Sequence, residues 1–272
     1  MIKVDNLYKL SKLENVTNDN CPSFSGIVAG ECKGDLWVDE IDNPQIAIVS
    51  SYAVGSFAFL GTINNDHEYM CLNNFIKNEI FDFLKQKGVN CFEFSIESDN
   101  FKPYILRMFK KKTIQREKEY SFRKTEQLDI NYSLPDGFTM QRVDYSFWKK
   151  IVNGDFENEN FLTKRLLESW GNFDNFISKS LAFSITYSNK IVSVIVGTAR
   201  FKNVIPIDIE TDDKFKRKGF GYYLTVEFVN ECFNKGLVVQ WDCVESNANS
   251  CKLAEKAKLK LFRENEVYWF DI

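Results

Sequence analysis

The order of segments between residues 204 and 244 constrains the fold of this chain more than any other feature of its sequence. A predicted strand, Val204–Thr211, is followed by a basic turn and then by a helical pattern over Gly219–Asn234. Gly236 stands where a helix commonly ends, and Leu237–Val244 is a nearly continuous apolar run. Such a run is typical of a central strand that is buried on both faces of a sheet. The order therefore predicts an α/β fold.

Residues 137–272 carry further strands and helices around this central segment. Strands are predicted at Phe138–Val143, Leu181–Tyr187 and Ile191–Arg200, and helices at Tyr145–Val152, Phe161–Trp170 and Ser250–Lys258. The polar turn Ser188–Lys190 predicts that the second and third of these strands form a hairpin. Lys260–Phe262 and Val267–Asp271 are predicted to close the chain as another hairpin.

Residues 1–130 show a similar order. Strands are predicted at Ile46–Tyr52, Phe57–Gly61 and Val89–Ile96, helices at Glu68–Gln86 and Phe101–Phe109, and an edge strand at Tyr120–Lys124. The turn at Pro135–Gly137 marks a boundary, which predicts a smaller α/β domain at 1–130 and a second domain at 137–272. A Lys-Gly pair ends the main helix of each half. Two interpretations stay open, an ancient duplication and the common use of glycine to end helices.

The composition excludes several classes of protein. Lys and Arg number 35 against 38 Asp and Glu, so a broad basic face for nucleic acid is not expected. No segment reaches the ~18 apolar residues of a membrane span, and the N-terminus lacks the apolar core of a signal peptide. The single histidine, His67, rules out a multi-histidine metal site, and the seven cysteines form no CxxC motif. We therefore expect a cytoplasmic protein with reduced thiols and no metal.

The basic turn before the long helix has the features of an anion-binding loop. Lys216, Arg217 and Lys218 precede Gly219-Phe220-Gly221. The first turn of a helix offers unpaired N–H groups, and glycine lets the backbone approach a pyrophosphate closely. Three cations at a helix N-terminus are unfavourable unless an anion is bound. The alternative is a basic surface turn whose glycines only permit the bend. The dinucleotide pattern GxGxxG and the Walker pattern are both absent.

This loop resembles the Q/R-x-x-G-x-G/A pyrophosphate loop of the GNAT superfamily of acyl-coenzyme A dependent N-acyltransferases. The segment Asn247–Lys256 is similar to the element that follows in that family, N-x-x-S/A-x-x-L-[YA]-x-K. Two motifs in the expected order are far more specific than either alone. The resemblance implies a GNAT fold, with a mixed central sheet flanked by helices, for residues 137–272.

The first half also resembles a known group. GDLWVDEIDNPQIAIV and FAFLGTINND are similar to the N-terminal region of a bacterial GNAT group that includes zwittermicin A resistance proteins. This similarity covers residues 30–130 and includes no catalytic motif. Because no glycine loop follows Phe57–Gly61, a GNAT-like first half is not expected to bind coenzyme A.

The resemblance implies that acetyl-CoA is the co-substrate and assigns ten residues to its binding. They comprise two positions on a strand, the whole glycine loop and two positions before or in the next helix: Ile209, Thr211, Lys216, Arg217, Lys218, Gly219, Phe220, Gly221, Asn247 and Ser250. Lys216 stands where the family usually has Arg or Gln, which keeps the charge but loses a planar fork. Ala254 stands where many members have the tyrosine thought to protonate the leaving thiolate, so the general acid is left unassigned.

Asp208 and Glu210 are the candidate catalytic residues. Side chains two residues apart on a strand share one face, so either carboxylate could accept the amine's proton directly or through water. Glu210 is preferred. The alternative is that both are surface carboxylates that balance Lys216–Lys218. Cys251 is interpreted as a buried inert thiol, although the first turn of a helix also stabilises a thiolate.

The predicted function is transfer of an acetyl group from acetyl-CoA to a primary amine of an unidentified small molecule, by direct attack. The alternative is a catalytically silent acyl-CoA sensor or scaffold, which the absence of the family's tyrosine favours. The expected partners are acetyl-CoA and an amine acceptor, without nucleic acid or membrane, and a homodimer is left open.

Overall fold

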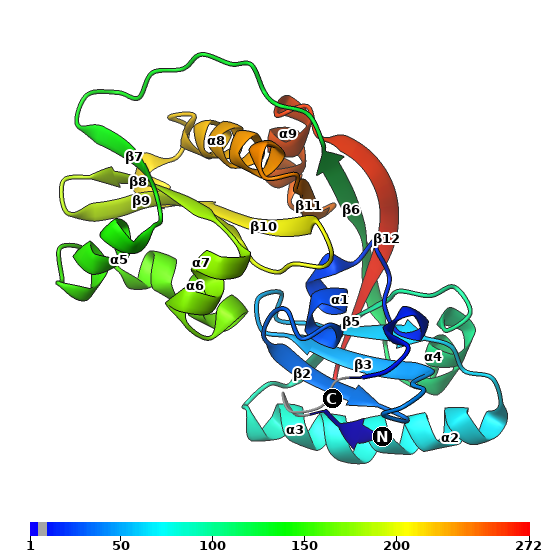
Figure 1. The fold of residues 1–272 in the computed structure, drawn as a ribbon. Coiled ribbons are helices and arrows are strands. Elements are labelled where there is room, and N and C mark those ends of the chain that lie inside the picture. Colours follow the sequence, from blue (N-terminus) through cyan, green and yellow to red (C-terminus); the bar gives the residue numbers. More distant parts are fainter. Residues whose placement is uncertain (5–9) are drawn as a thin grey trace. The chain divides into compact units, whose positions relative to one another are not determined.

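The computed structural model describes residues 1–4 and 10–272, which form two compact units. Unit 1 consists of Met1–Glu119, Val244–Ser246 and Glu264–Ile272, and unit 2 consists of Tyr120–Cys243 and Asn247–Arg263. Two strands, β6 (Gln115–Lys124) and β12 (Lys260–Asp271), contribute residues to both units. Figure 1 shows the course of the chain and the elements of each unit.

Unit 1 is a sheet with helices on both faces. Its strands follow the order β1 (Ile2–Lys3), β2 (Gly34–Val38), β3 (Ile46–Ser51), β4 (Phe57–Gly61), β5 (Cys91–Ile96) and β12. β4 and β5 pair in parallel. The other neighbouring strands in this order, all of whose residues the structure describes, pair antiparallel. The helical elements are η1 (Leu13–Asn15), α1 (Pro22–Val28), α2 (Asp66–Phe75), the π-helical η2 (Ile76–Ile80), α3 (Phe81–Gln86) and α4 (Lys102–Met108).

Strand alternation separates the two apolar layers of unit 1. Leu36 and Val49 pack with Phe24 of α1, whereas Trp37 and Ile48 pack with Leu72 of α2. Phenylalanine dominates the second layer: Phe59, Phe92, Phe94 and Phe101 are completely buried. The helix predicted at Glu68–Gln86 is confirmed as the continuous run α2-η2-α3.

Unit 2 contains the central segment that the sequence singled out. Its strands follow the order β6, β11 (Val238–Val244), β10 (Val204–Thr211), β9 (Lys190–Gly197), β8 (Ala182–Tyr187) and β7 (Phe138–Arg142). A short helix, η3 (Asp213–Phe215), follows β10. In Figure 1, α8 (Phe220–Asn234) and α9 (Ala248–Lys256) cover one face of this sheet, and α5 (Tyr145–Val152), α6 (Asn160–Trp170) and α7 (Phe173–Lys179) cover the other. The predicted mixed sheet flanked by helices is confirmed.

Two predictions, one about the last residues of the chain and one about Tyr120–Lys124, are wrong. Residues 260–271 form one continuous strand, not a hairpin. The polar residues read as a turn face β6 instead, where Glu264 pairs with Lys118 at 3.2 Å and Glu266 pairs with Arg116 at 3.0 Å. Because β12 lies on one side of β6 and β11 on the other, Tyr120–Lys124 is not an edge strand.

The compact units do not coincide with the ranges 1–130 and 137–272, since unit 2 begins at Tyr120 and the chain returns to unit 1 at Glu264. Whether those ranges fold independently stays a prediction. Two short helices, α1 and α7, lie in segments where the sequence patterns predict no helix or strand. Among the helices formed by residues 1–4 and 10–272, none has both the length and the apolar composition needed to cross a membrane.

Candidate active site

The sheet of unit 2 opens between β10 and β11. These strands pair in parallel at Val204–Pro206 with Val238–Gln240. Beyond Pro206, β10 continues to Thr211 with β9 as its antiparallel partner. The two parallel strands therefore separate along the second half of β10, at the end of the strand that leads into the basic loop.

Backbone N–H groups in the second half of β10 point toward this opening. The N–H of Thr198 donates to the carbonyl of Pro206 at 2.9 Å, and the N–H of Asp212 donates to the carbonyl of Val192 at 2.9 Å. Because paired and unpaired positions alternate in an antiparallel ladder, even-numbered residues of β10 direct their backbone groups toward β9. The N–H groups of Ile209 and Thr211 consequently point to the side from which β11 has separated.

The glycine loop has a conformation that side chains disfavour. Gly219 has a φ of 85°, and Arg217 adopts a φ of 65° without being glycine. In α8, every residue of which is described, no side chain caps the N-terminus and no acidic residue lies in the first turn. The first N–H groups of the helix therefore face the loop without a side-chain acceptor, in a field that favours anions.

Gly221 has a packing role that the sequence analysis did not assign. A Cβ at this position would lie 3.1 Å from Cδ2 of Leu253 on α9 and 3.6 Å from Cδ1 of Ile209. The glycine thus lets the first turn of α8 approach α9 closely. At Gly219, by contrast, a Cβ would meet only the ring and hydroxyl of Tyr223, at 3.1–3.3 Å.

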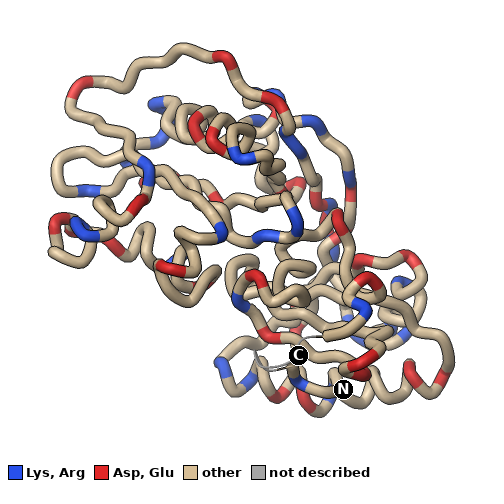
Figure 2. Tube along the Cα trace, in the orientation of Figure 1, with Lys and Arg blue, Asp and Glu red and all other residues tan. Residues whose placement is uncertain are grey.

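The three basic residues of the loop are not equivalent. Lys216 forms an ion pair with Asp213, and the hydrogen bond and charge of Lys216 lower the pKa of Asp213. Nζ of Lys218 lies 5.9 Å from the ring centroid of Phe138. Figure 2 shows basic and acidic residues interspersed along the chain within each unit. The charge of Lys216 is therefore balanced by Asp213 rather than by Asp208 or Glu210.

Asp208 and Glu210 share one partner, Arg165 of α6. Nε of Arg165 lies 2.7 Å from Oδ2 of Asp208, and its NH2 group contacts Oε2 of Glu210. The guanidinium is about one-fifth exposed, whereas the two carboxylates are nearly half exposed. NH1 of Arg165 also donates to the carbonyl of Phe161. The predicted common face of the two carboxylates is confirmed, and a cation that the sequence analysis missed holds both of them.

A sequence signal for Arg165 was present. Within α6, Leu162, Leu166 and Ser169 are buried, and Arg165 occurs on the same side of the helix at spacings of three and four residues. A charged residue among the inward positions of an amphipathic helix needs a partner of opposite charge on the element that the helix covers. The carboxylates of the neighbouring strand are that partner.

Asn247 and Ser250 both carry hydrogen bonds within the protein. The side chain of Asn247 caps α9 by accepting the N–H of Ser250 at 3.2 Å. Oγ of Ser250 accepts the indole N–H of Trp241 at 2.8 Å, so this side chain is held against β11. Ala254, which stands at the position of the family's tyrosine, is completely buried and carries no hydroxyl.

Two tyrosines that the sequence analysis did not single out lie beside the loop. Tyr132 stacks on Tyr223 with ring centroids 4.6 Å apart and an angle of 10°. The Tyr132 hydroxyl donates to Glu227 at 2.6 Å, and burial, followed by this contact, raises the pKa of Tyr132. Tyr223 is therefore held against the glycine loop by a partner from outside α8.

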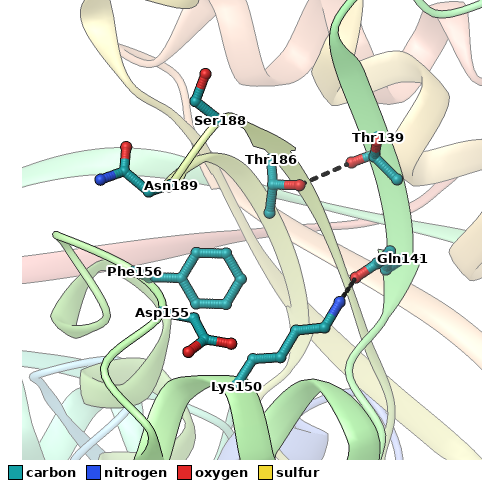
Figure 3. A pocket seen from close by; sticks show the side chains of 8 residues that line it. All are labelled: Thr139, Gln141, Lys150, Asp155, Phe156, Thr186, Ser188 and Asn189. Carbon is teal, nitrogen blue, oxygen red and sulfur yellow. Dashed lines mark hydrogen bonds between the residues drawn. The ribbon is translucent and has the colours of Figure 1, made fainter.

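A separate pocket of about 360 Å³ lies between β7, β8 and the segment after α5 (Figure 3). Nζ of Lys150 donates to Oε1 of Gln141 there at 3.3 Å, and Phe156 forms part of the wall. The eight lining residues include none of the predicted cofactor-binding or catalytic residues. This pocket is distinct from the opening between β10 and β11.

Comparison with known proteins identifies the family. A family model described as GNAT acetyltransferase matches residues 15–268. The chain belongs to the GNAT acetyltransferase family. It is an N-acetyltransferase of that family, whose members use acetyl-CoA as co-substrate.

Individual relatives agree with this assignment. The "Uncharacterized N-acetyltransferase YdfB" of Bacillus subtilis (strain 168) is 25% identical over 268 residues, which cover 96% of this chain and 95% of the relative. A GCN5-related N-acetyltransferase-like protein from Streptococcus suis 89/1591 has a TM-score of 0.58 at 20% identity, over 87% of this chain and 88% of that one. A tandem GNAT protein from the clavulanic acid biosynthesis pathway has a TM-score of 0.56 at 7% identity, over 89% and 83% of the two chains. The two structural likenesses support the fold alone.

Proposed function

We propose that unit 2 binds acetyl-CoA at the glycine loop and transfers its acetyl group directly to a primary amine of a small molecule. The observation that carries this proposal is the separation of β10 from β11 beside the uncapped N-terminus of α8. An extended thioester cofactor requires backbone donors along its arm and an anion site at its pyrophosphate. The opening supplies the first and the loop supplies the second.

The residues present fit this cofactor. The uncapped first turn after Gly219, together with Arg217 and Lys218, would hold the pyrophosphate. The N–H groups of Ile209 and Thr211 would bind the pantetheine arm and the thioester carbonyl. Acetyl-CoA supplies the activated acetyl group when it is bound, and Phe220, which is buried, anchors the helix that presents the loop.

In the proposed reaction the amine nitrogen attacks the thioester carbonyl carbon, and the C–S bond breaks. Glu210 accepts the proton of the amine, directly or through water, and the thiolate of coenzyme A is protonated as it leaves. Arg165 positions Glu210 and Asp208 and must yield one carboxylate oxygen to the incoming amine. The side chain that protonates the thiolate is not assigned.

Calorimetric titration of the full chain with acetyl-CoA tests the cofactor site. Binding should be lost in Gly219→Trp, because the indole would fill the loop. Gly88→Trp is the matched control, since Gly88 also has a positive φ, of 72°, but lies after α3 with open space around it. Equal affinity of the two variants would overturn the proposal, as would a native chain that fails to bind acetyl-CoA at low salt.

A silent acyl-CoA sensor is the second candidate function. Two observations favour it: Ala254 replaces the family's tyrosine, and Arg165 occupies both candidate bases. Release of free thiol from acetyl-CoA in the presence of mixed amines separates the candidates. Binding without amine-dependent release supports the sensor, and amine-dependent release that Glu210→Gln abolishes supports the enzyme.

The remaining assignments are also part of this proposal. A small amine acceptor follows from the similarity of the first half to the bacterial group with zwittermicin A resistance proteins, which is an analogy at the level of the fold. A bacterial and cytoplasmic origin and a homodimer belong to the same proposal. Sedimentation of the purified chain would test the dimer.

A further inference from the structure

Two cysteines of unit 2 lie in direct contact. Sγ of Cys243 on β11 is 3.2 Å from Sγ of Cys251 in the first turn of α9. All seven cysteines lie in the described part of the chain, and all are reduced thiols. A disulfide has an S–S bond of about 2.05 Å, so the two sulfurs need to approach by only about 1 Å. We propose that Cys243 and Cys251 form a redox-active dithiol, which low-molecular-weight disulfides oxidise to an intramolecular disulfide.

The contact is held by a second link between the same two elements. The indole N–H of Trp241 on β11 donates to Oγ of Ser250 on α9 at 2.8 Å. Trp241 precedes Cys243 by two residues and so shares its face of the strand, and Ser250 is the neighbour of Cys251. Asn247 also caps this turn of α9. The hydrogen bond and the cap position the two thiols before any reaction, which lowers the entropy lost when the disulfide closes.

The two thiols differ in access, which orders the reaction. Cys251 is half-buried and Cys243 is only 7% exposed, so a disulfide RSSR reaches Cys251 first. Cys251 loses its proton to solvent, attacks one sulfur of RSSR, breaks the S–S bond and releases one RS⁻, which leaves a mixed disulfide. Cys243 then loses its proton to solvent, attacks Sγ of Cys251 and releases the second RS⁻. The two protein thiols are oxidised by two electrons, and RSSR is reduced to two RSH.

The second displacement is the slow one. Burial, and then the hydrogen bond to Cys251, raise the pKa of Cys243 to about 12. Burial, the larger cause, persists when Cys251 is in the mixed disulfide, so the thiolate of Cys243 stays scarce at neutral pH and the mixed disulfide should accumulate briefly before the ring closes.

Closure of the disulfide would act on the proposed cofactor site, and this consequence rests on the proposed function. The turn that carries Cys251 also carries Asn247 and Ser250, and Leu253 of the same helix packs against the position of Gly221. Oxidation draws this turn toward β11 by about 1 Å. Displacements of that size can lower reaction rates by up to ~100-fold, so oxidised protein should transfer acetyl groups more slowly.

Mass spectrometry of the full chain after incubation with oxidised glutathione tests the dithiol. Trypsin releases residues 236–252 as one peptide, because no Lys or Arg lies between Lys235 and Lys252. After acid quenching and alkylation, this peptide should carry no alkyl group and should have lost two hydrogens. Cleavage after Glu245 should then fail to separate its two halves until a reductant is added.

Variants locate the reaction. Cys251→Ser should leave the peptide unoxidised, and Cys243→Ser should stop at the mixed disulfide with glutathione. The exposed Cys71 of α2 gives the matched control, since Cys71→Ser should still form the cross-link. A native peptide that stays fully alkylated, or that stops at the mixed disulfide, overturns the proposal. The native chain decides this even if one variant fails to fold.

The consequence for the cofactor site has its own readout. Acetyl-CoA is titrated into reduced and oxidised protein, and thiol release is measured for both after removal of glutathione. Equal affinities and rates would overturn the coupling while the peptide masses still establish the dithiol. If neither form binds acetyl-CoA, the proposed function fails, and the masses decide the dithiol independently.

Discussion

The two units share an order of strands and helices but differ in the residues at the N-terminus of one helix, α2 in unit 1 and α8 in unit 2. In each, a strand is paired antiparallel to the strand before it, a helix follows, and the next strand joins it in parallel: β4, α2-η2-α3 and β5 in unit 1, and β10, α8 and β11 in unit 2. The N-terminus of α2 is closed by Asn65, which accepts the N–H of Glu68 at 2.9 Å, and two acidic residues lie in its first turn. The N-terminus of α8 has glycine, neighbouring cations and no cap.

The strands that precede these two helices also differ in their side chains. Phe57 and Phe59 of β4 are buried and touch the ring of Phe92 on β5, with centroids 5.2 Å and 6.2 Å apart. In unit 2, β10 continues beyond the three residues that pair with β11, and this second half carries the half-exposed Asp208 and Glu210. The strand of unit 1 thus contributes buried aromatic rings, whereas the strand of unit 2 contributes exposed carboxylates. A shared order of elements thus does not imply a shared site.

The buried aromatic rings of unit 1 should contribute to the stability of the protein and not to the binding of acetyl-CoA. Phe92→Ala removes a ring that contacts six other aromatic rings on β4, β5, α3, β12 and the segment after α4, and should lower the free energy of unfolding by about 4 kcal/mol. Chemical denaturation measures the loss, and Phe233→Ala, which removes a half-exposed ring of α8, is the control. A changed affinity of the folded variant for acetyl-CoA would break the division of roles.

The carboxylates of β10 should matter for turnover. Glu210→Gln should lower amine-dependent thiol release by about 100-fold or more, because general base catalysis contributes at least that much. Arg165→Gln should lower it by about tenfold, since it removes positioning rather than the proton acceptor. Acetyl-CoA affinity, measured by calorimetry, should be unchanged in both variants. An unchanged rate in Glu210→Gln removes this residue as the base.

An acidic residue in the first turn of α8, as in the first turn of α2, should weaken anion binding there. Tyr222→Glu places a carboxylate in the first turn of the helix and should reduce acetyl-CoA affinity by about fivefold, which corresponds to ~1 kcal/mol. Glu68→Gln, which alters the first turn of α2, is the control and should bind as the native chain does. Equal affinities for all three proteins would argue against pyrophosphate binding at α8.

The ion pair between Lys102 and Glu266 in unit 1 should contribute a small, pH-dependent part of the free energy of unfolding. Lys102, followed by Tyr268, lowers the pKa of Glu266, so the unfolded chain binds the proton more tightly than the folded one. The contribution is complete above the ordinary glutamate pKa and is lost as pH falls through the lowered value. Glu266→Gln should therefore cost up to ~1 kcal/mol at pH 7 and almost nothing near pH 3. Urea unfolding at both pH values measures it, and a constant difference would contradict it.

Local patterns predicted the elements of the site but not their partners. Periodicity and glycine placement located β10, α8 and β11 within a residue or two, and strand alternation placed Asp208 and Glu210 on one face. Arg165 could not be assigned to them, because the contact depends on how α6 crosses the sheet. The closing strand was misread since charges at 263–266 are typical of a turn, and only the pairing with β6 keeps them extended. The Cys243–Cys251 contact likewise depends on how α9 packs.

The return of the chain to unit 1 sets an order for its synthesis. Residues 267–271 of β12 pair with residues 91–95 of β5, and Phe270 packs against Phe92 with ring centroids 5.7 Å apart. While a ribosome is still translating unit 2, the edge of β5 has no final partner and its aromatic layer lacks two rings. The half without a predicted catalytic role is therefore the last to be completed. A nascent chain halted before residue 264 would expose that edge to other unpaired strands.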